Sequence, residues 1–281
     1  MPAQYTPPAH SDEIRVSFPQ EHTMLLVINR PKALNAVSHT MTSSINDVLN
    51  WFNDEPSLWV VVITGQGRTF CAGADLVAWR QQTLVARHAE ELERIADDHN
   101  GFASLSRRTM VKPIIAAVNG SAYGGGTEIV LNCDIVVASE EAVFLLPEVK
   151  HGVVAIQGGI PRLGKVAGHQ RASEMLFTAR PISAHEAYTH FGFVNKVVPK
   201  SQVLATALDF ARQINLNSPD AIQSTKRALL LTRQKADVED AVAAHVYSPE
   251  GKRSYLGDNM KEGLNAFVER RKPVWKNPAK L

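Results

Sequence analysis

Two glutamates in the middle of the chain have the setting that acid–base chemistry needs. Glu128 follows the glycines Gly124 to Gly126, at the point where a strand-like segment passes into an apolar helical one. Backbone N–H groups at a helix start are free to bind an anion, and Gly125 lies on the same helix face as Glu128. An oxyanion donor and a base could therefore serve one ligand. The alternative is that Glu128 only complements the helix dipole.

Glu148 is the second acidic candidate, and it follows the apolar stretch Phe144 to Pro147. A carboxyl group with apolar neighbours is poorly solvated, which raises its pKa and lets it hold a proton near neutral pH. This setting predicts a general acid. The alternative is an exposed glutamate at a helix start after Pro147.

A loop of small residues, 67–76, joins a predicted strand to the next helical segment. Small residues let a ligand approach the backbone closely, so the main-chain N–H groups of this loop could point at an oxyanion. The same sequence is also consistent with a tight turn in which Asp75 caps a helix.

Two nucleotide-binding patterns come close to the sequence and fail on one residue type each. A Walker P-loop beginning at Gly120 needs Lys and then Ser or Thr after Gly125, but Gly126-Thr127 stands there, so the phosphate-binding cation is missing. The dinucleotide fingerprint beginning at Gly65 needs a third glycine where Phe70 stands. Both patterns are excluded.

Metal binding is excluded by spacing as well. His185 and His190 lie five residues apart. That spacing separates them by about 140° on a helix, so they cannot easily share one ion. Cys71 and Cys133 form no C-x-x-C pair, so neither a zinc ribbon nor a disulfide scaffold is expected. The sequence therefore predicts no metal and no cofactor.

The composition is that of a globular protein with a sizeable core. The chain has 281 residues, of which 44% are hydrophobic and 21% charged, with a formal net charge of +2. This length suits one α/β domain, with or without an appended subdomain, and the small charge predicts no nucleic-acid or membrane partner. The ending Ala279-Lys280-Leu281 is a variant of the peroxisomal S-K-L signal. The sequence thus predicts a peroxisomal location in a eukaryote and a cytoplasmic one otherwise.

Apolar runs and helical periodicity divide the chain in two. Continuous apolar strands, which indicate a sheet covered on both faces, are predicted at 24–29, 60–64, 114–118 and 135–138, with helices at 38–52 and 84–107. Beyond residue 202 only helices are predicted, at 202–214, 221–231, 238–246 and 259–268. We therefore expect an α/β core at 1–200 and a helical region at 201–281, whose apolar faces need another surface such as a neighbouring subunit.

Taken in order, these segments resemble the crotonase (enoyl-CoA hydratase) superfamily. The resemblance runs from an N-terminal signature at 29–36, through a first oxyanion loop at 70–76 and a glycine-rich motif at 116–138, to the C-terminal helices. It implies an α/β spiral of ββα turns, followed by a helical region that assembles a homotrimer or a hexamer made of two trimers.

The resemblance also assigns roles to residues of this chain. The N–H groups of Ala72 and Gly125 would form the oxyanion hole, and Glu128 with Glu148 would catalyse reversible addition of water to a 2-enoyl-CoA, giving a 3-hydroxyacyl-CoA in fatty-acid or acyl-CoA degradation. CoA is then part of the substrate. The residues implied in binding it are Lys32, Ala33, Leu34, Gly73, Ala74, Asp75, Leu76 and Gly124, with Phe267 and Arg270 reaching a neighbouring subunit's nucleotide.

Two segments depart from the family pattern, and both affect the expected acyl pocket. Leu145 and Leu146 precede the Pro-Glu pair where the family has Gly and a polar residue, and 154–159 departs from the usual P-G-A-G-G. Chain length, branching or reaction type could differ, because one scaffold carries several reactions. A Δ3,Δ2-enoyl-CoA isomerase with one working carboxylate is the enzymatic alternative. An RNA-binding member is the non-enzymatic one, although the sequence has no basic helix stripe.

Overall fold

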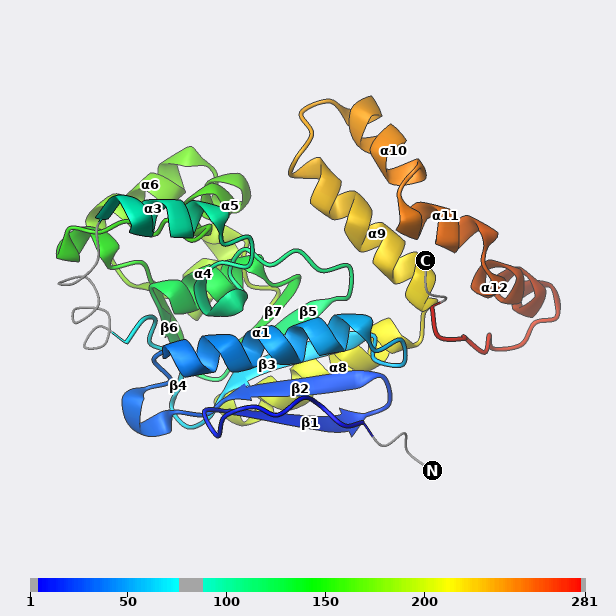
Figure 1. The fold of residues 1–281 in the computed structure, drawn as a ribbon, viewed down its shortest axis with the longest axis horizontal. Coiled ribbons are helices and arrows are strands. Elements are labelled where there is room, and N and C mark those ends of the chain that lie inside the picture. Colours follow the sequence, from blue (N-terminus) through cyan, green and yellow to red (C-terminus); the bar gives the residue numbers. More distant parts are fainter. Residues whose placement is uncertain (1–4, 76–87, 279–281) are drawn as a thin grey trace.

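The computed structural model describes residues 5–75 and 88–278, which form two sheets with helices around them (Figure 1). Among these residues the first sheet has six strands in the order β1-β2-β3-β5-β7-β10, and all its pairs are parallel except β1 with β2. Its strands are β1 (Ile14–Gln20), β2 (Thr23–Ile28), β3 (Val60–Gly65), β5 (Ile114–Val118), β7 (Ile135–Ser139) and β10 (Lys196–Val198).

The second sheet explains how the chain winds. It has four strands in the order β4-β6-β8-β9. They are β4 (Thr69–Cys71), β6 (Ser121–Tyr123), β8 (Val143–Leu145) and β9 (Ile182–Ser183). Strand β3 leads into β4, β5 into β6 and β7 into β8, so each turn adds one strand to each sheet before a helix follows. The expected α/β spiral of ββα turns is confirmed.

Alternating side chains of the first sheet face two separate cores. Val61 and Ile63 of β3 pack in the larger cluster with α1 (His39–Asp54), while Val60 and Val62 pack in a second cluster with α8 (Val203–Asn215). Helices α1 and α8 therefore cover opposite faces of the sheet. This arrangement explains why the strands read as continuous apolar runs. It also shows that core packing continues through α8.

Helix α4 (Gly125–Asn132) fills the larger core beside the second sheet. Every residue of this helix is buried, including the polar Thr127 and Glu128. The Thr127 hydroxyl donates to the Ala122 and Leu145 carbonyls at 2.7 and 3.0 Å, which joins the helix to β6 and β8. A buried helix start is thereby held at a fixed position in the core.

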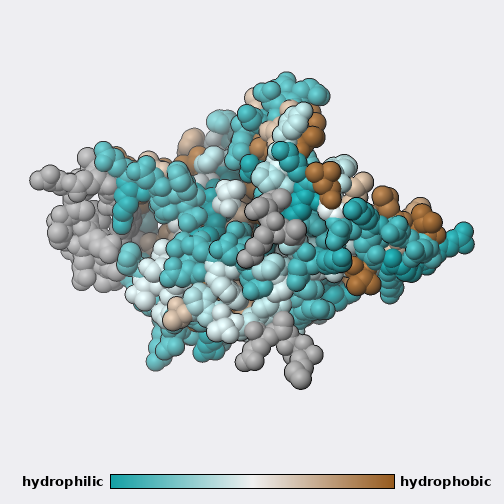
Figure 2. Space-filling view, turned by 45° about the vertical axis from the view of Figure 1, so that its right-hand side comes forward, coloured by the Kyte–Doolittle hydropathy of each residue, from teal (hydrophilic) through white to brown (hydrophobic). Residues whose placement is uncertain are grey.

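The C-terminal helices extend away from the two sheets (Figure 1). They are α9 (Pro219–Thr232), α10 (Val238–Val246), α11 (Pro249–Leu256) and α12 (Asp258–Val268). Helix α9 is attached to the core by the buried Lys226, whose ammonium donates to Asp134 Oδ2 and to the Lys112 carbonyl, each at 2.8 Å. Apolar side chains nevertheless lie open on this region, as Figure 2 shows in brown on the part turned toward the viewer.

One predicted helix is shorter than expected. Helix α3 (His88–Asp97) ends ten residues before residue 107, where periodicity predicted the helix end, and the expected start at 84 lies outside the described residues. The Asp98 carboxylate accepts the N–H groups of Asn100 and Gly101 at 3.0 Å, and Gly101 has φ of +67°. These local bonds end the helix and turn the chain into a single 3-10 turn, Phe102–Ser104.

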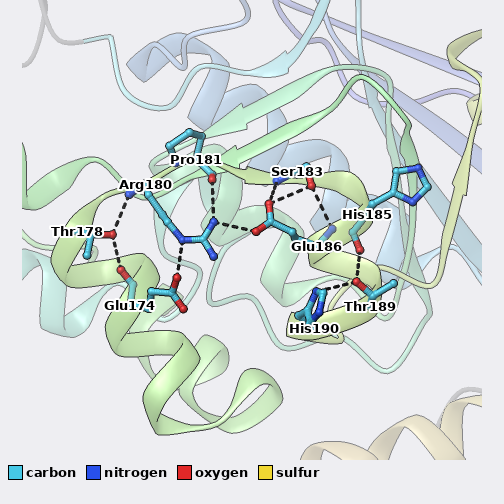
Figure 3. A network of polar contacts seen from close by, with 9 residues as sticks. All are labelled: Glu174, Thr178, Arg180, Pro181, Ser183, His185, Glu186, Thr189 and His190. Atoms are coloured by element: carbon cyan, nitrogen blue, oxygen red, sulfur yellow. Dashed lines mark hydrogen bonds and ion pairs between the residues drawn. The ribbon is translucent and has the colours of Figure 1, made fainter.

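The short strands of the second sheet, the strands β1 and β10 of the first, and helices α5 (Gly159–Ala167), α6 (His169–Thr178) and α11 had no predicted counterpart. Helix α6 is joined to the next segment by the network drawn in Figure 3, where the Arg180 guanidinium bonds to Glu174 at 2.7 Å and to Glu186 at 2.9 Å. Glu186 closes a capping box with Ser183, so the last ββα turn has a defined end.

Among the residues that the structure describes, no helix has the length and apolar character needed to cross a bilayer.

Candidate active site

Glu128 lies in the first turn of α4, and only 3% of the residue is exposed. The Gly159 N–H donates to its Oε1 at 2.9 Å. Burial and, less strongly, the charge of Glu148 raise the pKa of this carboxyl group to about 7 against the opposing effect of that hydrogen bond. A Cβ atom on Gly159 would lie 2.8 Å from the Glu128 Cγ, so the glycine makes the room that the side chain occupies.

Glu148 opens a short 3-10 turn, Glu148–His151, directly after Pro147. Its Oε2 is buried and has no hydrogen-bond partner among the described residues, and burial raises its pKa. A Cβ atom on Gly124 would lie 3.1 Å from Oε1, so the carboxyl group rests against the turn that starts α4. Glu128 and Glu148 therefore place two carboxyl groups at one helix start, which together we call the acid pair.

Gly125 supplies a backbone N–H at the helix start where the acid pair lies. It is the first residue of α4, so its N–H has no acceptor inside the helix. The Phe102 ring covers Gly125 so closely that a Cβ atom there would lie 2.4 Å from the ring. Gly73 approaches from the neighbouring loop, and a Cβ atom on it would lie 3.5 Å from the Gly125 nitrogen. The structure thus brings Gly73, Gly124 and Gly125 together with the acid pair.

The N–H group of Ala72 differs from that of Gly125 in its hydrogen bonding. Its N–H donates to the Leu34 carbonyl at 3.1 Å, so this second expected oxyanion donor is engaged within the protein. A thioester oxygen bound at this donor would have to share the N–H with Leu34 or displace that carbonyl.

The residues expected to bind CoA lie on two adjoining segments. Lys32 and Ala33 belong to the 3-10 turn Pro31–Ala33, which Leu34 ends with a left-handed φ of 52°. This segment is joined to the oxyanion loop by a bridge between Val37 and Ala74. The Arg30 guanidinium pairs with Asp75 at 3.3 Å. Leu76 lies outside the described residues.

Phe267 and Arg270 are not brought to the acid pair within one copy. They lie at the end of α12, in the part of the molecule that extends away from the sheets, and Phe267 is 84% exposed (Figure 1). Any contact with CoA at residues 32–34 would require them to come from another copy.

Three residues of the site were missed from the sequence. Phe102 lies over Gly125, the Gly159 N–H binds Glu128, and the backbone of Gln157 lies close enough to that carboxylate to lower its pKa. The paired glycines at 158–159 were a usable signal, because adjacent glycines often mark a close approach of backbone to another group. Nothing in the sequence around Phe102 indicated that its ring would reach α4.

The departures at Leu145 and Leu146 have different consequences. The Leu145 carbonyl accepts the Gly124 N–H at 2.8 Å, a role that any residue type can fill. The Leu146 side chain is buried, so this position contributes apolar bulk beside the acid pair.

The acid pair and the adjacent N–H support one kind of chemistry. Two carboxyl groups with raised pKa values can exchange protons with a substrate near neutral pH, and a free N–H at a helix start can stabilise an oxygen that becomes negative. Among residues 5–75 and 88–278, no three His, Cys, Asp or Glu side chains come close enough to hold a metal ion.

Comparisons with known proteins agree with this chemistry. The family model described as enoyl-CoA hydratase/isomerase matches residues 20–278. A mevalonyl-coenzyme A hydratase of Aspergillus fumigatus is 46% identical over 266 residues, 95% of each chain. A mevalonyl-coenzyme A hydratase of Beauveria bassiana is 42% identical over 276 residues, 96% of this chain and 97% of the relative.

Solved structures give the same assignment. The crystal structure of an enoyl-CoA hydratase from Mycobacterium tuberculosis aligns with a TM-score of 0.84 at 31% identity, covering 95% of this chain and 100% of the other. The family model, the relatives and the solved structure each match nearly the whole chain. The chain therefore belongs to the enoyl-CoA hydratase/isomerase family.

Proposed function

We propose that this chain, a hydratase of CoA thioesters, interconverts a 3-hydroxyacyl-CoA and the corresponding 2-enoyl-CoA with Glu128 and Glu148 as its two acid–base groups. The observation that carries the proposal is the acid pair itself. Both carboxyl groups have raised pKa values and lie at the same helix start, which is what a reaction needing one base and one acid requires.

In the dehydrating direction, one carboxylate removes the C2 proton, and the other carboxylic acid protonates the C3 hydroxyl as it leaves as water. The charge that develops on the thioester oxygen is stabilised by the Gly125 N–H, and loss of one such donor costs about 3 kcal/mol. Hydration runs through the same steps in reverse. No step needs a cofactor, because CoA is part of the substrate.

The proposed acyl group is that of mevalonyl-CoA, which carries a methyl group on C3 and a hydroxyl group on C5. Support comes from the two fungal relatives, each named for mevalonyl-coenzyme A, at 46% and 42% identity. Within the departing segment 154–159, the backbone of Gln157 and Gly159 reaches Glu128, so an acyl group larger than a straight short chain would meet this end of the segment.

The test follows the ultraviolet absorbance of the conjugated 2-enoyl thioester with mevalonyl-CoA and with straight-chain CoA thioesters. We expect the Glu128→Gln and Glu148→Gln variants each to lose at least about 100-fold in rate, since general acid–base groups contribute about 10² to 10⁴. Glu141→Gln, a change at an exposed glutamate, is the control. An isomerase would depend on one glutamate only and would consume 3-enoyl-CoA thioesters, so that result would replace the hydratase proposal.

The assembly that we propose is a homotrimer, alone or paired into a hexamer. Large apolar side chains stay exposed on the C-terminal helices, and single subunits rarely leave contiguous apolar patches of this kind uncovered. They include Val238, Val242, Val246, Tyr247, Tyr255, Leu256, Met260, Leu264, Phe267 and Val268. Light scattering should give a mass of three or six copies, and Leu264→Asp should reduce it whereas Lys261→Gln should not. A monomeric wild-type protein would reject the proposal.

The proposed location in a eukaryotic cell is the peroxisome, on the basis of Ala279-Lys280-Leu281, which lie outside the described residues. A fluorescent fusion that lacks this tripeptide and still enters peroxisomes would contradict the proposal.

A further inference from the structure

Gln157 lies closer to the acid pair than its place in the sequence suggested. It stands two residues before Gly159 in the segment 154–159, and its backbone lies close enough to the Glu128 carboxylate to lower the pKa of that group, while the Gly159 N–H donates to it at 2.9 Å. On its other side, the Gln157 carbonyl accepts the Ser106 hydroxyl at 2.7 Å. The backbone at Gln157 is therefore held by these contacts, and the direction in which the side chain leaves it is restricted.

The side-chain amide of Gln157 lacks a hydrogen-bond donor for its oxygen within the described part of the chain. Its Oε1 is buried and has no hydrogen-bond partner among the described residues. An unpaired acceptor of this kind costs about 1–3 kcal/mol, so a buried one needs an explanation. Glu148 Oε2 is the other such atom beside the acid pair, and the proposed reaction uses it. The proposed proton transfers leave Gln157 without a role.

The surroundings make this acceptor selective. Leu146 and Ala155 are buried apolar residues on the two segments that carry Glu148 and Gln157. Because Oε1 is buried, it gains its full hydrogen-bond energy only from a ligand that brings a donor, while a ligand with only alkyl groups leaves it unpaired.

We propose that Gln157 is the residue that recognises a hydroxyl group on the acyl chain beyond C3, by accepting its hydrogen bond at Oε1. The inference rests on the proposed hydratase function and deepens it. In mevalonyl-CoA this hydroxyl group is on C5, two carbons beyond C3. Because the acid pair must reach C3, the C5 hydroxyl group would lie close to the acid pair. Gln157 makes no bond to the reacting atoms, so its effect is on the choice of substrate.

The experiment compares two substrates that differ by one hydroxyl group. These are the 2-enoyl-CoA formed by dehydration of mevalonyl-CoA and the same thioester with hydrogen in place of the C5 hydroxyl. For each protein, the ratio of the two kcat/KM values is measured, and a partial loss of folded enzyme cancels in this ratio. One hydrogen bond worth about 1–3 kcal/mol predicts a wild-type ratio of about 5 to 150 in favour of the hydroxyl.

Three variants make the measurement specific. Gln157→Met keeps the length of the side chain without its acceptor and should bring the ratio to within about twofold of one. Gln157→Leu should do the same. Glu141→Gln, a change at an exposed glutamate outside this segment, should keep the wild-type ratio.

The outcomes that overturn the inference are separable from failure of the proposed function. If wild type hydrates both thioesters equally well, or if Gln157→Met keeps the wild-type preference, Gln157 does not recognise the hydroxyl although the hydratase assignment stands. If wild type hydrates straight-chain thioesters but neither branched one, the proposed substrate fails and this inference fails with it. If it hydrates no 2-enoyl-CoA, the proposed function itself is wrong.

Discussion

The two-sheet core and the C-terminal helices bury their apolar surface to very different extents. In the core, alternate faces of the first sheet are covered by α1 and α8, and the strand β3 is buried along its whole length. On α10, by contrast, no residue is buried, although the helix has three valines. The sheet is covered on both faces in one copy, whereas the C-terminal helices leave apolar side chains exposed, as the proposed assembly would explain.

This difference separates two tasks of the proposed enzyme. The acid pair lies in the two-sheet core, whose apolar faces are covered within one chain. We therefore expect its geometry not to depend on association with other copies. Phe267 and Arg270, which were expected to contact the nucleotide of CoA, lie at the end of α12, in the region whose apolar side chains are exposed. We therefore expect changes in the core to affect kcat and changes in α12 to affect KM.

The largest expected effect concerns the junction between the two regions. Asp134→Asn would leave the buried Lys226 ammonium without its negative partner, and removing one member of a buried pair costs about 3–5 kcal/mol. Lys226→Met should cost less, because it removes the buried charge as well. Chemical denaturation of the three proteins tests this order, and equal stabilities would mean that the pair does not hold α9 to the core.

A somewhat smaller effect should appear as a gain in stability. The pKa of Glu128 in the folded protein, about 7, lies above its ordinary value of 4.5, so the folded state binds this proton more tightly than the unfolded state does. Its contribution is therefore complete below pH 4.5 and is lost as the pH rises through 7. Glu128→Gln should raise the free energy of unfolding at pH 8 by about 3 kcal/mol and change it little at pH 4.5. Denaturation at both pH values measures this, and a pH-independent difference would contradict the raised pKa.

Gly159→Ala tests the core without touching the assembly. Its Cβ atom would lie 2.8 Å from the Glu128 Cγ and would displace the carboxyl group, and a misplacement of about 1 Å can cost 10²-fold in rate. We expect kcat to fall by about that factor while the mass of the oligomer stays the same. Gly164→Ala, where a Cβ atom meets no other group, is the matched control.

The smallest effect is expected on α12 and its end. Arg270→Ala should raise KM for CoA thioesters about two- to fivefold and leave kcat unchanged, because an exposed ionic contact is worth about 0.2–1 kcal/mol. Lys272→Ala, a nearby exposed cation, should not change KM. An equal response to both changes would indicate a general effect of charge instead of a specific phosphate contact.

The sequence alone predicted those features that follow from local patterns. The buried strands β2, β3, β5 and β7 and the helices α8, α9, α10 and α12 were predicted because the periodicity of apolar residues indicates which faces are covered, whereas α11 was missed. The two glutamates were singled out by their neighbours, a glycine-rich helix start for Glu128 and an apolar run for Glu148. The carboxyl end of the predicted helix at 84–107 was wrong, since the side chain of Asp98 competes for the backbone N–H groups that a helix would need.

Other features depend on contacts between distant segments and have no local signal. Strands of three residues, such as β4 and β6, are too short to show a period, so the second sheet stayed hidden. The Gly159 N–H that binds Glu128 comes from 31 residues away along the chain. The bond from Ala72 to the Leu34 carbonyl likewise joins two segments that only the fold brings together.

The burial of Glu128 also bears on the thermodynamics of ligand binding. A carboxyl group with a pKa of about 7 is partly protonated in neutral buffer. An acyl group that fills the site removes more water from it and raises that pKa again, so binding takes up protons from the solution. The enthalpy measured by titration calorimetry near neutral pH must then vary with the ionisation enthalpy of the buffer. Proton counting of this kind would report on the carboxyl group before any bond in the substrate has changed.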